Sequence, residues 1–287
     1  TEIEHHSNFI PWHLQRKYNG AVLKFLKIDN EHQIDIEDIE SLISERTKVI
    51  AITHLSNTTG QTIDIKKVCD IAHKHGIIVV VDGTQSAPHM KVDVQDLGCD
   101  FYVMSGHKMY GPSGIGIMYA KRIWIDKLDP ALGGGGIVET VEHDNVEYSE
   151  GSKKWEAGTL AITEIIGLHE ALKFYERTGF DMMIDHEQDV INYAYDRLSE
   201  LPYLKLIGNN KRKAVISFNV GNIHQQDMAM FLDAYGIAIR AGHHCTQILH
   251  RQIGWSGSCR ISTGIYNCKE DIDYLVDSIV NIYDRFN

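Results

Sequence analysis

The stretch that decides the expected fold is Phe101-Tyr-Val-Met-Ser-Gly-His-Lys-Met-Tyr-Gly-Pro-Ser-Gly-Ile-Gly116. Its apolar start ends in a turn of small residues, and this turn carries Lys108 between glycines. A companion stretch upstream, Gly76-Ile-Ile-Val-Val-Val-Asp-Gly-Thr-Gln85, is a β-branched run that ends at Asp82. Continuous Val and Ile runs of this length are typical of strands in a parallel sheet that is buried on both faces.

Asp82 and Lys108 are therefore expected at the same edge of the sheet. Ligands of such sheets bind outside the carboxyl ends of the strands, so both side chains would face one crevice. An aldehyde cofactor that is held as a lysine Schiff base, with an aspartate at its pyridine nitrogen, needs these two groups. A plain ion pair between the lysine and the aspartate is the alternative that the spacing leaves open.

The first part of the chain predicts an open α/β sheet, because strands alternate with helices. We expect Asp64 to cap one of these helices, since an aspartate oxygen can accept from the first free amides of a helix. The expected strands are 21–28, 47–55, 79–82, 101–105 and 114–120, and the expected helices are 36–43 and 65–75. Residues 137–149 read as a loop or a hairpin.

The pattern changes near residue 160, where we place a domain boundary. Residues 1–160 would form a large domain with a mainly parallel sheet, and residues 161–287 a smaller α+β domain. Asn267 and Glu270 have capping-box spacing before the last helix. The helices expected in the second domain are 162–177, 181–201, 225–235 and 272–286, and the strands are 204–207, 214–220, 237–240 and 260–265.

Composition restricts the function further. The 287 residues are 43% hydrophobic and 23% charged, as in a soluble globular protein. A formal net charge of -11 argues against nucleic acid and anionic membranes as partners. No apolar run approaches the length of a membrane span, and five scattered cysteines do not form a disulfide framework. We expect a cytoplasmic protein.

Further candidate side chains follow other expected strands. His5 belongs to a Glu-His-His-Ser-Asn stretch, and Asn57 and Gln85 also come after strand ends. Arg240-Ala-Gly-His-His-Cys245 places a cysteine in a cationic loop, where a thiolate is favoured, and Arg260 follows shortly after.

Each of these candidates has a simpler interpretation. Paired histidines are commonly solvated surface residues, and Arg240 could pair with a surface carboxylate. The sequence His243-His-Cys245 could hold zinc, although adjacent residues on an extended chain point in opposite directions. Four cysteines could be small buried hydrophobes: Cys69, Cys99, Cys259 and Cys268.

Taken together, the motifs resemble one family. Glu4–Trp12, Thr53–Gly60, Ser105-Gly-His-Lys108, Glu156–Thr159 and the Arg-x-Gly-His-His-Cys stretch are similar, in order and spacing, to the PLP-dependent cysteine desulfurases. The resemblance is greatest to the Suf-type branch, which includes selenocysteine lyases, and it covers essentially the whole chain. It implies an α/β, fold-type-I PLP-dependent transferase with a homodimeric assembly.

The resemblance also implies roles for individual residues. Lys108 would carry pyridoxal 5'-phosphate as a Schiff base, and Cys245 would accept sulfur. Arg260 would hold the substrate carboxylate, and Arg240 would help to position the substrate. The remaining residues would contact the cofactor: Asp82 its ring nitrogen, His5 its ring face, Asn57 and Gln85 its phenolic oxygen, and Ser105, His107 and the neighbouring subunit's Thr159 its phosphate.

The implied reaction converts L-cysteine to L-alanine and leaves a persulfide on Cys245. A sulfur-acceptor protein in iron-sulfur cluster assembly would then take the sulfur. The alternatives are a selenocysteine lyase, or an inactive or scaffolding homologue. Because the sequence opens at Thr1 without an initiator methionine, we expect that an N-terminal segment is absent. In the family this segment supplies a Gly/Thr turn to the cofactor phosphate. We therefore expect weakened cofactor binding.

Overall fold

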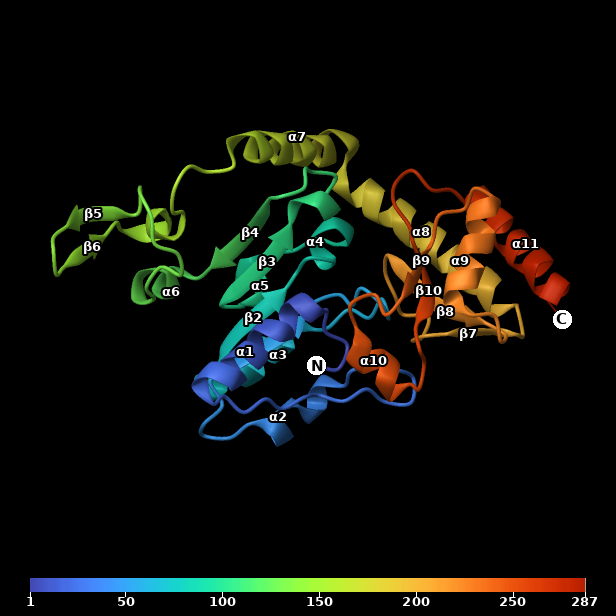
Figure 1. Ribbon diagram of the computed structural model, residues 1–287, viewed down its shortest axis with the longest axis horizontal. Helices are drawn as coiled ribbons and strands as arrows, with labels where there is room; N and C mark the ends of the chain where they lie inside the picture. The colour runs from blue at the N-terminus through green and yellow to red at the C-terminus, as the bar shows by residue number, and fades with distance from the viewer. Residues whose placement is uncertain (287) are drawn as a thin grey trace.

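The centre of the molecule is a four-stranded sheet with the order β1-β2-β3-β4 (Figure 1). The structure is a computed structural model that describes residues 1–286. Strands β1 (Val49–Thr53), β2 (Ile78–Asp82) and β3 (Phe101–Ser105) are parallel, and β4 (Gly116–Ala120) runs antiparallel to β3. The predicted mainly parallel α/β sheet is therefore confirmed.

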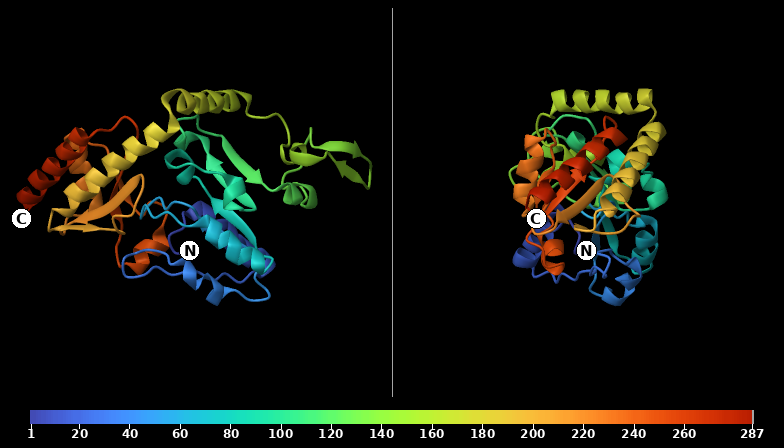
Figure 2. Two further views of the ribbon diagram at one scale, coloured as in Figure 1. Left: turned by 180° about the vertical axis from the view of Figure 1, so that it is seen from behind. Right: turned by 90° about the vertical axis from the view of Figure 1, so that its right-hand side faces the viewer.

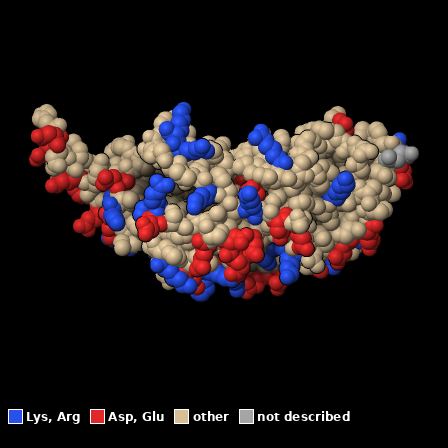
Figure 3. Space-filling model, turned by 90° about the horizontal axis from the view of Figure 1, so that it is seen from below, with Lys and Arg blue, Asp and Glu red and all other residues tan. Residues whose placement is uncertain are grey.

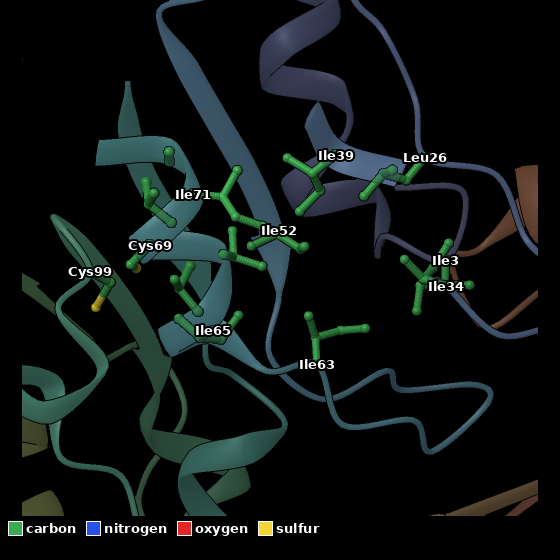
Figure 4. Close-up of a cluster of buried hydrophobic side chains, with 14 of the residues drawn as sticks. Ile3, Leu26, Ile34, Ile39, Ile52, Ile63, Ile65, Cys69, Ile71 and Cys99 are labelled. Atoms are coloured by element: carbon green, nitrogen blue, oxygen red, sulfur yellow. The ribbon is translucent and has the colours of Figure 1, made fainter. Parts of the chain in front are cut away.

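Helix α3 (Ile65–Lys74) covers one face of this sheet. Its start is fixed by Asp64, whose side chain accepts a hydrogen bond from the Lys67 amide, as predicted. Its apolar face joins a core that also collects side chains from the first forty residues (Figure 4). The residues labelled in this core include Ile3, Leu26, Ile34, Ile39, Ile52, Ile63, Ile65, Cys69, Ile71 and Cys99.

A second core is built wholly from later residues. It lies between an antiparallel sheet, with the order β7-β8-β10-β9, and three helices. The strands are β7 (Leu204–Leu206), β8 (Val215–Val220), β9 (Arg240–Gly242) and β10 (Ser258–Ser262). The helices are α8 (Phe180–Ser199), α9 (Gln225–Ala234) and α11 (Lys269–Phe286).

Helix α7 (Ile162–Thr178) connects the two regions and lies along the top of the molecule in Figure 1. Before it, β5 (Val138–Val141) and β6 (Val146–Tyr148) form a hairpin that projects away from the rest of the chain (Figure 2). The stretch 137–149 is thus a hairpin, which was one of the two structures expected for it.

The remaining elements are short. The α-helices are α1 (Ile10–Asn19), α2 (Ile39–Leu42), α4 (Ser86–His89), α5 (Val94–Leu97), α6 (Arg122–Lys127) and α10 (Gln247–Gln252). The 3₁₀ turns are η1 (His6–Asn8), η2 (Ile36–Asp38), η3 (Gly106–Lys108) and η4 (Gly151–Trp155).

The structure corrects the expected strand at 21–28. Residues 21–24 and Leu26 form no strand, and together with β1 they line a cavity of about 660 Å³. Only an isolated bridge between Ile28 and Ile34 forms there. The residues before His5 likewise form no strand.

Two further predictions are wrong in detail. The strand expected at 237–240 begins only at Arg240, because the Ile237 amide still bonds to the carbonyl of Leu232 in the preceding helix. The last helix begins at Lys269, and Asp271 rather than Glu270 closes back onto its start by accepting from the Cys268 amide.

The surface carries charges of both signs. Figure 3 shows basic and acidic side chains interspersed over the lower face, without a continuous basic area. Within residues 1–286, none of the helices combines the length and the apolar character that crossing a membrane requires. All five cysteines are free thiols, and Cys268 is exposed, which corrects the expectation that it packs in a core.

Candidate active site

Lys108 and Asp82 lie at the carboxyl ends of adjacent strands, as predicted. Asp82 is the last residue of β2, and Lys108 ends the turn η3 that directly follows β3. Burial lowers the pKa of the Lys108 amine, and the charge of Asp82 opposes this shift. The two groups are therefore close enough to interact electrostatically, at the edge of the sheet where the sequence predicts a ligand crevice. A partly desolvated amine at this edge can react as a nucleophile or a base.

The turn that carries Lys108 needs its glycine. A Cβ at Gly106 would lie 2.7 Å from Cγ2 of Ile115, closer than carbon atoms can approach without rearrangement. The same turn brings Ser105 and His107 together, with 2.9 Å between Ser105 Oγ and His107 Nδ1. Both predicted phosphate contacts thus share the turn with Lys108.

A buried hydrogen-bond network that the sequence analysis missed supports Asp82. Tyr102 Oη lies 2.6 Å from Ser86 Oγ and 2.9 Å from His54 Nδ1. The ring of Tyr102 fills the space beside Gly83, where a side chain would overlap it. The Asp82 carboxylate itself accepts from the Thr84 amide at 2.9 Å.

Burial keeps His54 in its neutral form. Its pKa is lowered from 6.5 to about 4 because the ring is buried, with a weaker opposing effect of Asp64. The sequence signal that could have revealed this network is the position of Tyr102 in β3. Side chains alternate between the two faces of a strand, and this position directs Tyr102 toward the buried face.

His5 lies close to both the lysine and the aspartate. Burial lowers the pKa of its ring, the charge of Lys108 lowers it further, and Asp82 raises it. Its Nδ1 accepts from the Ser7 amide at 3.1 Å, which fixes the ring at the start of η1. A neutral imidazole beside the crevice offers a flat face for an aromatic ring.

The loop with Cys245 reaches the same crevice from the second core. The charges of both Arg260 and Cys245 affect the pKa of Lys108, in opposite directions. The buried cysteines are poor nucleophiles, because burial raises the pKa of Cys69 and of Cys259 to about 12 and that of Cys99 to about 11. Cys245 is only partly buried and is the thiol of the crevice.

Two guanidinium groups face the crevice from neighbouring strands. Arg260 pairs with Arg240 across the antiparallel β10 and β9, which directs both side chains to one face. Burial lowers the pKa of Arg260 to about 10, and the Arg240 charge adds to this shift. Arg260 donates to the carbonyl of Asn57 at 3.0 Å, whereas its buried Nε has no partner in the described chain.

The remaining predicted residues differ in their positions. Asn57 is buried, and its Nδ2 donates to the carbonyl of His244 at 2.8 Å, so its amide faces the Cys245 loop. Gln85 is half-buried directly before α4, close in sequence to Asp82. Thr159 is exposed in the segment between η4 and α7.

The alternative that His243, His244 and Cys245 bind zinc is not supported by a set of converging ligands in residues 1–286. Nε2 of His244 already contacts the carbonyl and the hydroxyl of Ser258 at 3.0 and 3.1 Å. Over residues 1–286, His, Cys, Asp and Glu side chains nowhere gather in a group of three that could hold a metal ion.

Comparison with known proteins identifies the class. The family model of aminotransferase class-V matches residues 1–275, and this chain belongs to that family. It is 45% identical over 286 residues to a probable cysteine desulfurase of Halalkalibacterium halodurans. This match covers 100% of the present chain and 70% of that protein. A probable cysteine desulfurase of Staphylococcus aureus strain Mu50 is 42% identical over 289 residues, with the same shares covered.

Solved structures agree with this assignment. The cysteine desulfurase CsdA from Escherichia coli superposes with a TM-score of 0.95 at 34% identity, over 99% of this chain and 71% of that one. The apo cysteine desulfurase of Thermococcus onnurineus NA1 gives 0.94 at 35% identity, over 99% and 72%. The predicted fold-type-I architecture and the resemblance to cysteine desulfurases are confirmed.

The residues present fit the pyridoxal phosphate of this enzyme class. The crevice contains a buried amine of lowered pKa next to a carboxylate, as a Schiff base with a protonated pyridine requires. The buried Nε of Arg260 is a donor without an acceptor, which a substrate carboxylate can satisfy.

Proposed function

We propose that this chain is a PLP-dependent cysteine desulfurase, which converts L-cysteine to L-alanine and holds the released sulfur as a persulfide on Cys245. One observation carries the proposal: the charges of Asp82 and Cys245 both act on the buried amine of Lys108, although the three residues come from three separate parts of the chain. The names of the relatives at 45% and 42% identity support the same activity.

Six side chains would hold the cofactor around Lys108, which binds it covalently. The bound cofactor withdraws electrons from the substrate's Cα. Asp82 is assigned to the ring nitrogen, because a nearby carboxylate favours the protonated form and the charge of Asp82 acts on the Lys108 amine. The other contacts are assigned to His5 at the ring face, Asn57 and Gln85 at the phenolic oxygen, and Ser105 and His107 at the phosphate, where their short mutual contact supports a shared ligand.

The two guanidinium groups would select the substrate. Arg260 would bind the carboxylate of L-cysteine through its free donor, since a guanidinium matches a carboxylate in two places. Arg240 is more exposed and would position the substrate from the mouth of the crevice. Lys108, once its amine is free, is placed to take a proton from the bound substrate as a general base.

Cys245 would perform the sulfur transfer. Its thiolate Sγ forms a bond to the sulfur of the substrate, and the Cβ–S bond of the substrate breaks. The electron pair of that bond stays on the carbon side, where a proton completes alanine. Because the thiol lies on a loop at the surface of the crevice, it can present the persulfide to a sulfur-acceptor protein, for which iron-sulfur cluster assembly is the proposed destination.

A second copy of this chain would complete the assembly. Helix α7 exposes Ile162, Ile165 and Ile166, with Ile162 60% accessible, and β4 exposes Met118 at 51%. The three isoleucines share one face of α7, and an exposed apolar helix face is typical of an interface. Thr159 directly precedes α7 and would contact the phosphate bound by the neighbouring subunit.

We keep the division into residues 1–160 and 161–287, because the second core is built only from residues after 180. Packing crosses this boundary, since Ile207 and Leu249 join the first core and Tyr175 of α7 packs with Ala87 and Met109. A cytoplasmic location fits the five free thiols, since a reducing compartment keeps them reduced.

The test is a product assay with added pyridoxal phosphate. L-cysteine should give alanine and a sulfur product in equal amounts, and Cys245→Ala should abolish sulfur release. Cys259→Ala is the matched control, because that thiol is buried away from the crevice. Activity toward L-selenocysteine that persists in Cys245→Ala, without any toward L-cysteine in the parent, would favour a selenocysteine lyase. Absence of both activities with cofactor bound would favour a scaffolding role.

A further inference from the structure

The backbone at the proposed nucleophile is unusual. His244 and Cys245 have φ angles of 51° and 58°, so two consecutive residues with side chains lie in the left-handed region. This conformation persists in non-glycine residues only where surrounding contacts determine it. The contacts that hold the loop are therefore part of what fixes the position of the thiol.

Two of these contacts come from the N-terminal half of the chain. The His6 amide donates to the carbonyl of Cys245 at 2.8 Å, and Asn57 donates to the carbonyl of His244 at the same distance. The carbonyls of His244 and Cys245 are thus held by residues that lie more than 180 positions earlier in the chain.

The ring of His6 holds the other side of the loop. Its Nε2 accepts from the amide of Gln247, the first residue of α10, at 3.2 Å. The first amides of a helix need an acceptor from outside the helix. Thr246 occupies the capping position but makes no capping bond, because its hydroxyl contacts the carbonyl of His243 at 2.8 Å and Thr58 Oγ1 at 3.0 Å.

We propose that His6 is a positioning residue for Cys245, and that its imidazole replaces the missing helix cap and fixes the loop on the carboxyl side of the thiol. The proposal deepens the proposed function and rests on it for the catalytic consequence. His6 itself contacts neither substrate nor cofactor in this account. Its neighbour His5 faces the crevice, so the two adjacent histidines have separate tasks.

The test compares three variants. His6→Leu removes the acceptor, His6→Gln restores one, and His75→Leu is the matched control at an exposed histidine remote from the loop. All of them keep the backbone amide that bonds to Cys245. If His6→Leu does not fold, His6→Phe keeps a ring and also lacks the acceptor.

The first readout is hydrogen exchange of the peptide that contains Gln247, which needs no cofactor. Exchange should become about tenfold faster in His6→Leu, the factor expected for loss of one hydrogen bond, and should return toward the parent rate in His6→Gln. Unchanged exchange in His6→Leu, or equal acceleration in His6→Gln, would overturn the proposal.

The second readout is steady-state formation of alanine by the cofactor-loaded protein. The rate constant kcat should fall about tenfold in His6→Leu and recover in His6→Gln, while KM for L-cysteine stays within about twofold. A rise in KM alone would overturn the positioning role. If even the parent forms no alanine, the proposed function fails, and hydrogen exchange still decides whether His6 holds the loop.

Discussion

Gly83→Ala tests whether Tyr102 supports the end of β2. An added Cβ would overlap the aromatic ring and lie only 2.5 Å from Oη. Either the ring or the turn after Asp82 must move. Forced overpacking costs about 1–3 kcal/mol, and each of the two hydrogen bonds of the buried hydroxyl contributes about 1 kcal/mol. We therefore expect the free energy of unfolding to fall by about 3–5 kcal/mol.

Urea denaturation of a double-mutant cycle measures this effect. Tyr102→Ala makes room for the new methyl group. In that background Gly83→Ala should therefore lower the free energy of unfolding little more than the same substitution at an unobstructed glycine does. Gly133→Ala is a control for destabilisation by the substitution itself, because Gly133, like Gly83, has no left-handed φ, and no atom lies within 4 Å of the added Cβ. Equal costs of Gly83→Ala with and without Tyr102 would refute the steric argument.

Three further predictions concern the helix cap, pH and the substrate. Asp64→Ala should lower the free energy of unfolding by about 1 kcal/mol in urea denaturation, and Asp64→Asn should cost less; equal losses would contradict the capping role. His54 has a folded pKa of about 4 against 6.5 in the unfolded chain, so its stabilising effect is complete above pH 6.5 and is lost as the pH falls toward 4. The free energy of unfolding should fall by about 3 kcal/mol over that pH range. Urea denaturation of His54→Asn should show a smaller fall with decreasing pH, and an equal fall in the parent and the variant would refute the assignment. Arg260→Ala should raise KM for L-cysteine by the equivalent of about 2–5 kcal/mol in an alanine assay, and unchanged kinetics would remove Arg260 from the substrate site.

Much of the sheet could be predicted because its strands carry their own signal. The apolar runs that precede Asp82 and Ser105 are continuous, and the helix between β1 and β2 has an aspartate cap and an amphipathic face. Local sequence is enough for such elements. Since parallel strands end at one edge, the meeting of Asp82 with Lys108 followed from the same pattern.

The segment 21–28 shows where local sequence is insufficient. Its β-branched and apolar residues suit a strand, but a strand also needs a neighbour for its backbone hydrogen bonds, and this segment lines a cavity instead of pairing with β1. Propensity alone cannot supply that neighbour.

The contacts that support the site also could not be predicted from the sequence. The bonds from His6 and Asn57 to the Cys245 loop join residues more than 180 positions apart, with separations of 187 positions for Asn57 and 241 for the His6 ring. No spacing rule connects such residues. The network of Tyr102 with His54 and Ser86 was missed for the same reason, since each residue alone reads as ordinary core.

The most direct test of the central claim is mass spectrometry of the Cys245 peptide after the cofactor-loaded protein has reacted with L-cysteine. The account predicts one additional sulfur atom on Cys245 together with released alanine, and neither product in Lys108→Ala. A cofactor-loaded protein that forms no alanine and leaves Cys245 as an unmodified thiol would contradict it.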